Sequence, residues 1–251
     1  DPLYYPTIEH TGSVRFQAEE NLELGVLNFV LENERPTREM INEFSANNIT
    51  FGFQTTDQSV SAASVNFNYA DNADKNHRVI ISAENDVRFL PGVNMTVPAL
   101  SVSAKNFDVN NSQITVGATF GSEIDVMGEM KLRGGSTIES LSPYFNQAPK
   151  PVSIDISSEQ LILESGSYIG AWNHEDDTTG SKAIANLNIQ TGEISLEDAF
   201  IGTRTTNAAK AGDLEVAATG IVLGKDSRLG SYSFGKGESG DITTVSYTHL
   251  R

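Results

Sequence analysis

Pro151-Val-Ser-Ile-Asp-Ile-Ser-Ser-Glu-Gln-Leu-Ile-Leu-Glu-Ser-Gly166 contains two apolar-x-apolar triplets, Ile154/Ile156 and Leu161/Leu163, which begin 7 residues apart. Pairs of triplets at offsets of 6 to 8 residues recur along most of the chain: Val14/Phe16 with Leu22/Leu24, Val79/Ile81 with Val87/Phe89, Leu100/Val102 with Phe107/Val109, Ile124/Val126 with Met130/Leu132, Leu187/Ile189 with Ile194/Leu196, and Leu214/Val216 with Ile221/Leu223. One pair differs, since Ile49/Phe51 and Val65/Phe67 are 16 residues apart. This recurrence is typical of one supersecondary unit stacked many times.

Each triplet is interpreted as a short strand, because alternate side chains of a strand point to the same face. A third apolar position usually follows the second triplet, which favours three short strands per turn. The first strands are expected to begin at residues 14, 49, 79, 100, 124, 154, 187, 214 and 242. The sequence therefore predicts a right-handed parallel β-helix of about nine turns, with matching strands of successive turns paired in parallel. A sandwich of antiparallel hairpins is the alternative.

Almost all variation in turn length falls between the third strand of one turn and the first strand of the next. We therefore expect the inserted loops to lie at one corner of the coil, and residues 142–150, 172–182 and 203–210 are the loops predicted to provide the contact surface. Residues 35–44 are the one predicted helix, with Thr37 as its cap and Met40, Ile41 and Phe44 on one side.

The chain is interpreted as one solenoid domain over residues 1–244, in which residues 1–13 cover the open edge of the first turn. The tail Val245-Ser-Tyr-Thr-His-Leu-Arg251 resembles a translated adaptor from sequencing libraries and is excluded from the fold reasoning.

The composition of the chain excludes some binding partners and some kinds of chemistry. The net charge of -16 and the pI near 4.5 disfavour nucleic acid and anionic membranes as partners, because binding phosphates requires clustered Lys and Arg. The chain has no cysteine, which excludes disulfides, thiolate metal sites and thiol catalysis.

Carboxylates are the most prominent candidate site residues. The outward residues of the successive first strands are expected to be Arg15, Thr50, Ile80, Ser101, Asp125, Asp155, Asn188, Glu215 and Thr243. Asp125 and Asp155 would then be stacked neighbours, with Glu215 further along the same row. Such a row is typical of solvated surface carboxylates, although paired carboxylates can also hydrolyse glycosides and several oxygens can bind Ca²⁺.

A second acidic cluster follows the sole tryptophan of the chain, Trp172. It consists of His174, Glu175, Asp176 and Asp177. One histidine with three acids can bind a divalent ion, but the spacing fits neither a His-Glu-x-x-His helix nor an EF-hand loop. We interpret the cluster as a solvated insertion, and we expect no catalytic residue and no cofactor.

The repeats resemble those of filamentous-haemagglutinin-like bacterial exoproteins. The resemblance rests on the quoted segment 151–166, on residues 211–231, and on Ser233-Phe-Gly-Lys-Gly-Glu-Ser-Gly-Asp-Ile242. It implies a right-handed parallel β-helix, export by two-partner secretion or autotransport, and adhesion. The expected function is thus non-catalytic binding by a secreted or cell-surface adhesin segment to a surface glycan or protein, with an outer-membrane secretion partner if export is of the two-partner type. A polysaccharide lyase or hydrolase that uses Asp125 and Asp155, and a structural spacer stalk, are the alternatives.

Overall fold

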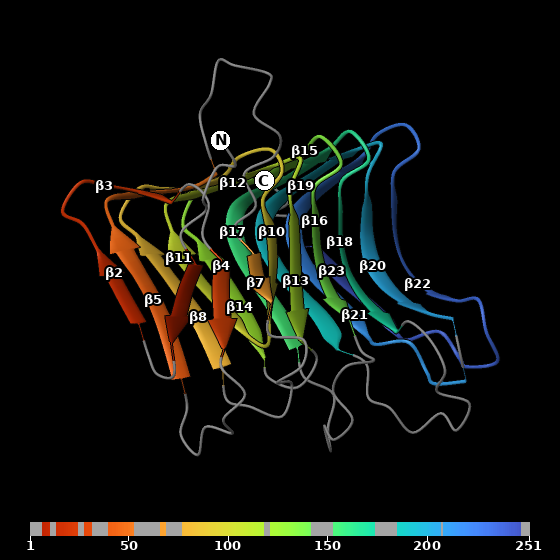
Figure 1. Cartoon of the computed structure of the whole chain (residues 1–251). Coiled ribbons are helices and arrows are strands. Elements are labelled where there is room, and N and C mark those ends of the chain that lie inside the picture. The colour runs from red at the N-terminus through yellow and green to blue at the C-terminus, as the bar shows by residue number, and fades with distance from the viewer. Residues whose placement is uncertain are drawn as a thin grey trace.

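The computed structural model describes residues 7–10, 14–24, 28–31, 40–52, 66–68, 77–117, 121–141, 153–173, 185–206 and 208–246. These residues form strands and turns and contain no helix, hence none that could cross a membrane. Every strand pairing among them is parallel. Figure 1 shows the strands stacked in chain order along one axis, as in a parallel β-solenoid.

The third strands of the repeats form a sheet of 9 strands, which we call the third-strand sheet. In spatial order its strands are β1 (Thr7–His10), β4 (Asn28–Leu31), β7 (Asn66–Asn68), β10 (Asn94–Val97), β13 (Gln113–Gly117), β16 (Thr137–Leu141), β18 (Tyr168–Asn173), β20 (Phe200–Thr205) and β22 (Arg228–Ser233). Chain order and spatial order agree, so each repeat adds one strand beside that of the repeat before it.

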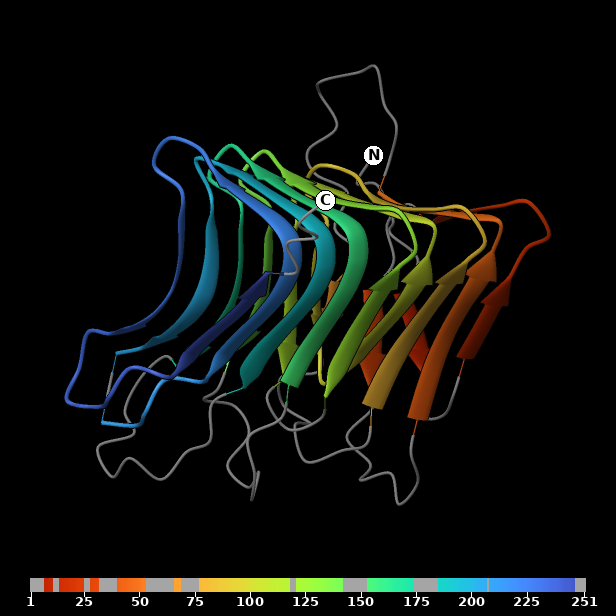
Figure 2. The same ribbon diagram turned by 180° about the vertical axis from the view of Figure 1, so that it is seen from behind.

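The first and second strands of the repeats belong to one sheet of 14 strands, which we call the bent sheet. The first strands are β2 (Val14–Gln17), β5 (Met40–Ala46), β8 (His77–Ala83), β11 (Leu100–Ala104) and β14 (Ser122–Val126). The second strands are β3 (Asn21–Leu24), β6 (Asn48–Phe51), β9 (Asp86–Phe89), β12 (Asn106–Asn110) and β15 (Glu129–Arg133). In the later repeats the two strands merge into β17 (Ser153–Glu164), β19 (Asn186–Glu197) and β21 (Leu214–Leu223), and β23 (Ile242–Ser246) follows. Figure 2 shows this sheet from behind, with the long merged strands curving around the coil.

The apolar triplets form the core between the two sheets, as the alternation predicts. Ile154, Ile156, Leu161 and Leu163 are buried in one cluster with the equivalent residues of the neighbouring repeats. Phenylalanines extend this cluster through the early repeats. Phe16 stacks on Phe44 at 5.2 Å between ring centroids, and the contacts continue through Phe51 and Phe89 to Phe107.

The second repeat differs from the prediction in strand assignment. Residues 40–46 form the first strand β5 and not the end of a helix, because Asn42 and Phe44 pair in register with Val79 and Ile81. Burial of Phe44 in the core outweighs the helical spacing of Met40, Ile41 and Phe44. Ile49 and Phe51 consequently lie in a second strand, which explains the aberrant 16-residue offset. Residues 35–39 lie outside the described residues.

Insertions are not confined to one corner. Long connections do separate third strands from the following first strands, as between β16 and β17. In the second repeat, however, β6 ends at Phe51 and the third strand β7 begins only at Asn66. The long connection there falls between the second and third strands.

Buried serines support the turn between the second and third strands. Ser112, Ser136 and Ser167 are stacked there, and the backbone N–H of each of the first two donates to the next serine hydroxyl, at 3.3 and 3.1 Å. The Ser136 hydroxyl donates in turn to the carbonyls of Val109 and Arg133. The hydroxyls of Ser136 and Ser167 therefore each serve both as donor and as acceptor for backbone groups.

Replacing Ser136 by alanine is expected to lower the free energy of unfolding by about 1 to 3 kcal/mol, because it leaves the buried Ser112 N–H without its acceptor. Ser227 occupies the same place before β22 but is not buried and bonds only locally to the carbonyl of Lys225. Ser227→Ala should therefore change stability by less than about 0.5 kcal/mol. Urea denaturation of both variants measures the difference, and equal losses would contradict a structural role for the serine stack.

Candidate binding site

The predicted carboxylate row forms, but with a different register. Asp155 lies opposite Glu123 on one side and Asn188 on the other, while Asp125 lies opposite Ser157. The prediction that Asp125 and Asp155 are stacked neighbours is therefore wrong. The shift arises because the buried Ser122, and not Ile124, occupies the first inward position of its strand, where its hydroxyl accepts from the N–H of Leu100 at 3.1 Å.

The second repeat also changes the row, because Glu43 takes the place predicted for Thr50. The side chains along the row bond to one another. Asp155 accepts hydrogen bonds from Ser153 and Asn188, both at 2.7 Å, and Asp125 accepts one from Ser157 at 2.5 Å. Glu215 is exposed opposite Asn188 and Thr243.

Within the described residues, Asp, Glu and His side chains do not gather into a group of three or more that could hold a metal ion, so the alternative of Ca²⁺ binding by Asp125, Asp155 and Glu215 gains no support there. His174, Glu175, Asp176 and Asp177 lie outside the described residues.

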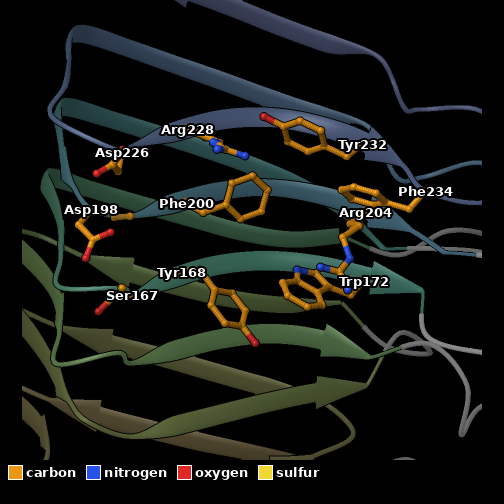
Figure 3. Close-up of a pocket in the computed structure, with 12 residues that line it drawn as sticks. Ser167, Tyr168, Trp172, Asp198, Phe200, Arg204, Asp226, Arg228, Tyr232 and Phe234 are labelled. Carbon is orange, nitrogen blue, oxygen red and sulfur yellow. The ribbon is translucent and has the colours of Figure 1, made fainter.

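A hollow of about 340 Å³ lies on the outer face of the third-strand sheet, across β18, β20 and β22 (Figure 3). Each of these strands places a large side chain on either side of a glycine. The three segments are Tyr168-Ile-Gly-Ala-Trp172, Phe200-Ile-Gly-Thr-Arg204 and Arg228-Leu-Gly-Ser-Tyr232. Parallel pairing aligns them residue for residue, so the large side chains form two borders around a central column.

Gly170, Gly202 and Gly230 form this column and face outward. A Cβ atom on Gly230 would lie 2.9 Å from the ring of Tyr232, and one on Gly170 would collide with the indole of Trp172. The rings therefore occupy the space that a side chain at these positions would take. Aromatic rings that lean over strand glycines compensate for the packing that glycine cannot supply.

The rings around the column are close to one another. Tyr168 and Trp172 stack at 4.8 Å between centroids, Phe200 and Tyr232 lie 5.7 Å apart, and Tyr232 and Phe234 lie 6.3 Å apart. Phe234, just beyond the end of β22, is 69% exposed. The hollow thus presents an apolar aromatic surface to solvent on a strongly acidic chain.

Arg204 lies among these rings. Its guanidinium carbon is 4.1 Å from the centroid of Trp172 and 5.4 Å from that of Phe234, which are cation–π distances. Arg228 borders the hollow on β22. Within the described part of the chain, neither arginine has a carboxylate within ion-pair distance, whereas Arg15, Arg88, Lys131, Arg133, Lys210 and Lys225 all do.

The margins of the hollow carry a tyrosine hydroxyl and two aspartate carboxylates. The hydroxyl of Tyr168 donates to Glu139 on β16 at 2.5 Å, and burial together with this carboxylate raises the pKa of Tyr168 above its ordinary value. Asp198 and Asp226 line the hollow where β20 and β22 begin, both at positive φ in the preceding turns. Tyr168 therefore remains a neutral donor at physiological pH, and the two aspartates offer acceptors at the edge.

Replacing Gly202 by alanine is expected to destabilise the chain by about 1 to 3 kcal/mol, because the added methyl would overlap the carbonyl oxygen of Gly230 and approach the Phe200 ring to 2.7 Å. Gly121 is the matched control, since a Cβ there meets only the carbonyl oxygen of Ser153 at 3.6 Å. Urea denaturation should show a loss for Gly202→Ala and little change for Gly121→Ala. An unchanged midpoint for Gly202→Ala would contradict the close packing of the column.

The predicted contact loops contribute to the hollow only at their first residues. Trp172 and Arg204 fall within segments 172–182 and 203–210, but both belong to strands, β18 and β20. Thr203 is buried and donates to Gly212 and Ser231, while Lys210 bonds to Asp213 and Asp241. Residues 142–150 and 174–182 lie outside the described residues. Sequence reasoning overlooked the face of the sheet, although the thrice-repeated glycine flanked at two residues by an aromatic ring or arginine is visible in the sequence.

Comparison with protein-family models, with curated proteins and with solved structures finds no significant match.

Proposed function

We propose that this chain is a segment of a secreted or cell-surface bacterial exoprotein of the adhesin type, which binds its ligand without catalysis. The observation that carries the proposal is the hollow on the third-strand sheet, where half-buried aromatic rings, the exposed Phe234 ring and two arginines are held on a regular parallel scaffold. Aromatic and arginine side chains are the types most enriched where proteins bind one another and where ligands stack. The resemblance of the repeats to filamentous-haemagglutinin-like proteins supports the extracellular setting, export across the outer membrane, and a right-handed coil of about nine turns.

A binding role accounts for the arrangement better than hydrolysis does. A carboxylate pair that cleaves glycosides flanks the scissile bond, with one member protonated as the general acid. Here Asp125 and Asp155 accept hydrogen bonds from serine and asparagine side chains, and neither of them lines the hollow. The described residues that line the hollow include no histidine or lysine.

Binding can be tested with the purified chain, fluorescently labelled, on fixed epithelial cells and on an array of immobilised glycans and extracellular matrix proteins. We expect saturable binding to at least one of these surfaces and a loss of at least about fivefold in affinity for Phe234→Ala, because an exposed ring in a contact surface contributes about 1 kcal/mol or more. Met127→Ala removes an equally exposed apolar side chain, 68% against 69%, from the turn between β14 and β15, and should bind normally.

Two outcomes would overturn the proposal. An absence of saturable binding on every surface would favour the spacer stalk. Turnover of polysaccharides by the chain, abolished in Asp125→Asn or Asp155→Asn, would instead favour the lyase or hydrolase.

A further inference from the structure

We infer that the hollow on the third-strand sheet binds an acidic oligosaccharide, with sugar rings against its aromatic surface and a sugar carboxylate on Arg204. This inference rests on the proposed binding function and specifies its ligand. It follows from three properties of the hollow: the accessible rings, the arginines, and the acceptors at its edge.

Tyr232 and Phe234 provide the stacking surface. Their planes are inclined by only 21°, and Phe234 is largely exposed. The glycine column lets the Tyr232 ring lie close against the sheet, so the aromatic surface, and not the glycines, is what a sugar ring would contact. The less polar face of a pyranose packs on such an aromatic surface.

Arg204 provides the charge. Cation–π contacts with Trp172 and Phe234 hold the guanidinium without neutralising it, and no carboxylate of the described residues is within ion-pair distance. A guanidinium held in this way can donate two parallel hydrogen bonds to a carboxylate. Trp172 acts here as a positioning residue for Arg204, and Arg228 adds a second positive charge along the same face.

The acceptors at the edge favour a sugar over an acidic peptide. Asp198 and Asp226 can accept hydrogen bonds from sugar hydroxyls, whereas the side chains of an acidic peptide offer carboxylates and no hydroxyl donors. The hollow thus combines one anion-binding position with an apolar platform and hydroxyl acceptors. A uronic acid chain has all three matching groups.

The sole tryptophan of the chain makes binding directly measurable, because Trp172 contacts the arginine that would hold the carboxylate. The probes are galacturonic acid hexasaccharide, the neutral cellohexaose, and hexaglutamate. We expect the galacturonate to change Trp172 fluorescence saturably, with weaker binding as salt increases. Arg204→Gln should weaken binding at least about tenfold, because it removes a charge-assisted bidentate contact.

Controls separate the site from general electrostatics. Arg133→Gln removes an arginine that pairs with Asp108 on β12 of the bent sheet, and should bind galacturonate like the unmodified chain. Phe234→Ala should weaken binding of the hexasaccharide by about fivefold, as measured by calorimetry. Circular dichroism of each variant establishes that the fold is retained.

Equal affinity for cellohexaose and galacturonate, or an Arg204→Gln variant that binds like the unmodified chain, would overturn the inference. Preference for hexaglutamate would replace the sugar with an acidic peptide. If the chain binds cells or matrix proteins but none of the three probes, the inference fails while the proposed function stands. If it binds no surface at all, the proposed function itself fails.

Discussion

Replacing Leu163 by aspartate is expected to prevent folding, whereas the same substitution at the adjacent Ile162 should leave the fold intact. Leu163 is completely buried in the core, in register with Leu132 and Leu196 of the neighbouring repeats. An aspartate there would place an uncompensated charge in the apolar interior, with a loss of at least about 4 kcal/mol in unfolding free energy. That loss is a large part of the total stability of an ordinary domain.

Ile162 is the matched control because its side chain points to the other face of β17, between Lys131 and Ser195. Aspartate at this position remains in contact with water and lies beside a lysine, so we expect a change within about 1 kcal/mol. Circular dichroism and urea denaturation of the two variants measure the contrast. Equal tolerance, or greater damage from Ile162→Asp, would contradict the inward direction of the triplet residues.

Truncation of Phe89 to alanine is expected to cost about 3 to 5 kcal/mol, because it leaves a large cavity in the core. The Phe89 ring is completely buried and contacts Phe51 at 4.7 Å and Phe107 at 5.7 Å between centroids. Both neighbours would lose an aromatic contact, and the stacked repeats above and below restrict how far the site can collapse.

Phe234→Ala is the comparison variant for Phe89→Ala. The same side chain is removed from the surface hollow, where it is largely exposed, and the expected loss is below about 1 kcal/mol. Thermal and urea unfolding of the two variants should therefore differ by several kcal/mol. A loss below about 1 kcal/mol for Phe89→Ala would show that the phenylalanine contacts do not stabilise the early repeats.

The parallel architecture could be predicted because the pattern that encodes it is local. Every second residue of a strand faces the core, so triplets such as Ile154/Ile156 and Leu161/Leu163 reveal strands without knowledge of their partners. Their nearly constant offset reveals repetition, and repetition implies stacking. For these residues local pattern and tertiary structure agree.

The register could not be predicted where a polar residue faces the core. Ser122 occupies an inward position because its hydroxyl satisfies a buried backbone N–H, and a search for apolar triplets overlooks it. The row of carboxylates was consequently shifted by one pair, with Asp125 in the place of Glu123. Asn42 is likewise buried in the first strand of the second repeat, where residues 40–44 resemble an amphipathic helix.

The candidate site was not predicted from the sequence, and the reason is a different one. Attention to loops and carboxylates follows from where binding residues usually occur, but the hollow is built on the outward face of regular strands. Its residues come from three repeats and become neighbours only through parallel pairing of Tyr168, Phe200 and Arg228. The glycine between large side chains is the local signal, and its meaning depends on the register.

Cysteine cross-linking tests this register most directly, since the chain has no native cysteine. In the structure, residues 123 and 155 lie opposite each other on paired strands, at a separation of about 4.8 Å that permits a disulfide. Residues 125 and 155 are diagonal neighbours roughly 7 to 8 Å apart, which a disulfide does not span without backbone movement. Under mild oxidation the Glu123→Cys/Asp155→Cys variant should form an intramolecular disulfide, detected by mass spectrometry, and the Asp125→Cys/Asp155→Cys variant should not. The reverse result would contradict the stacking on which the fold and the hollow depend.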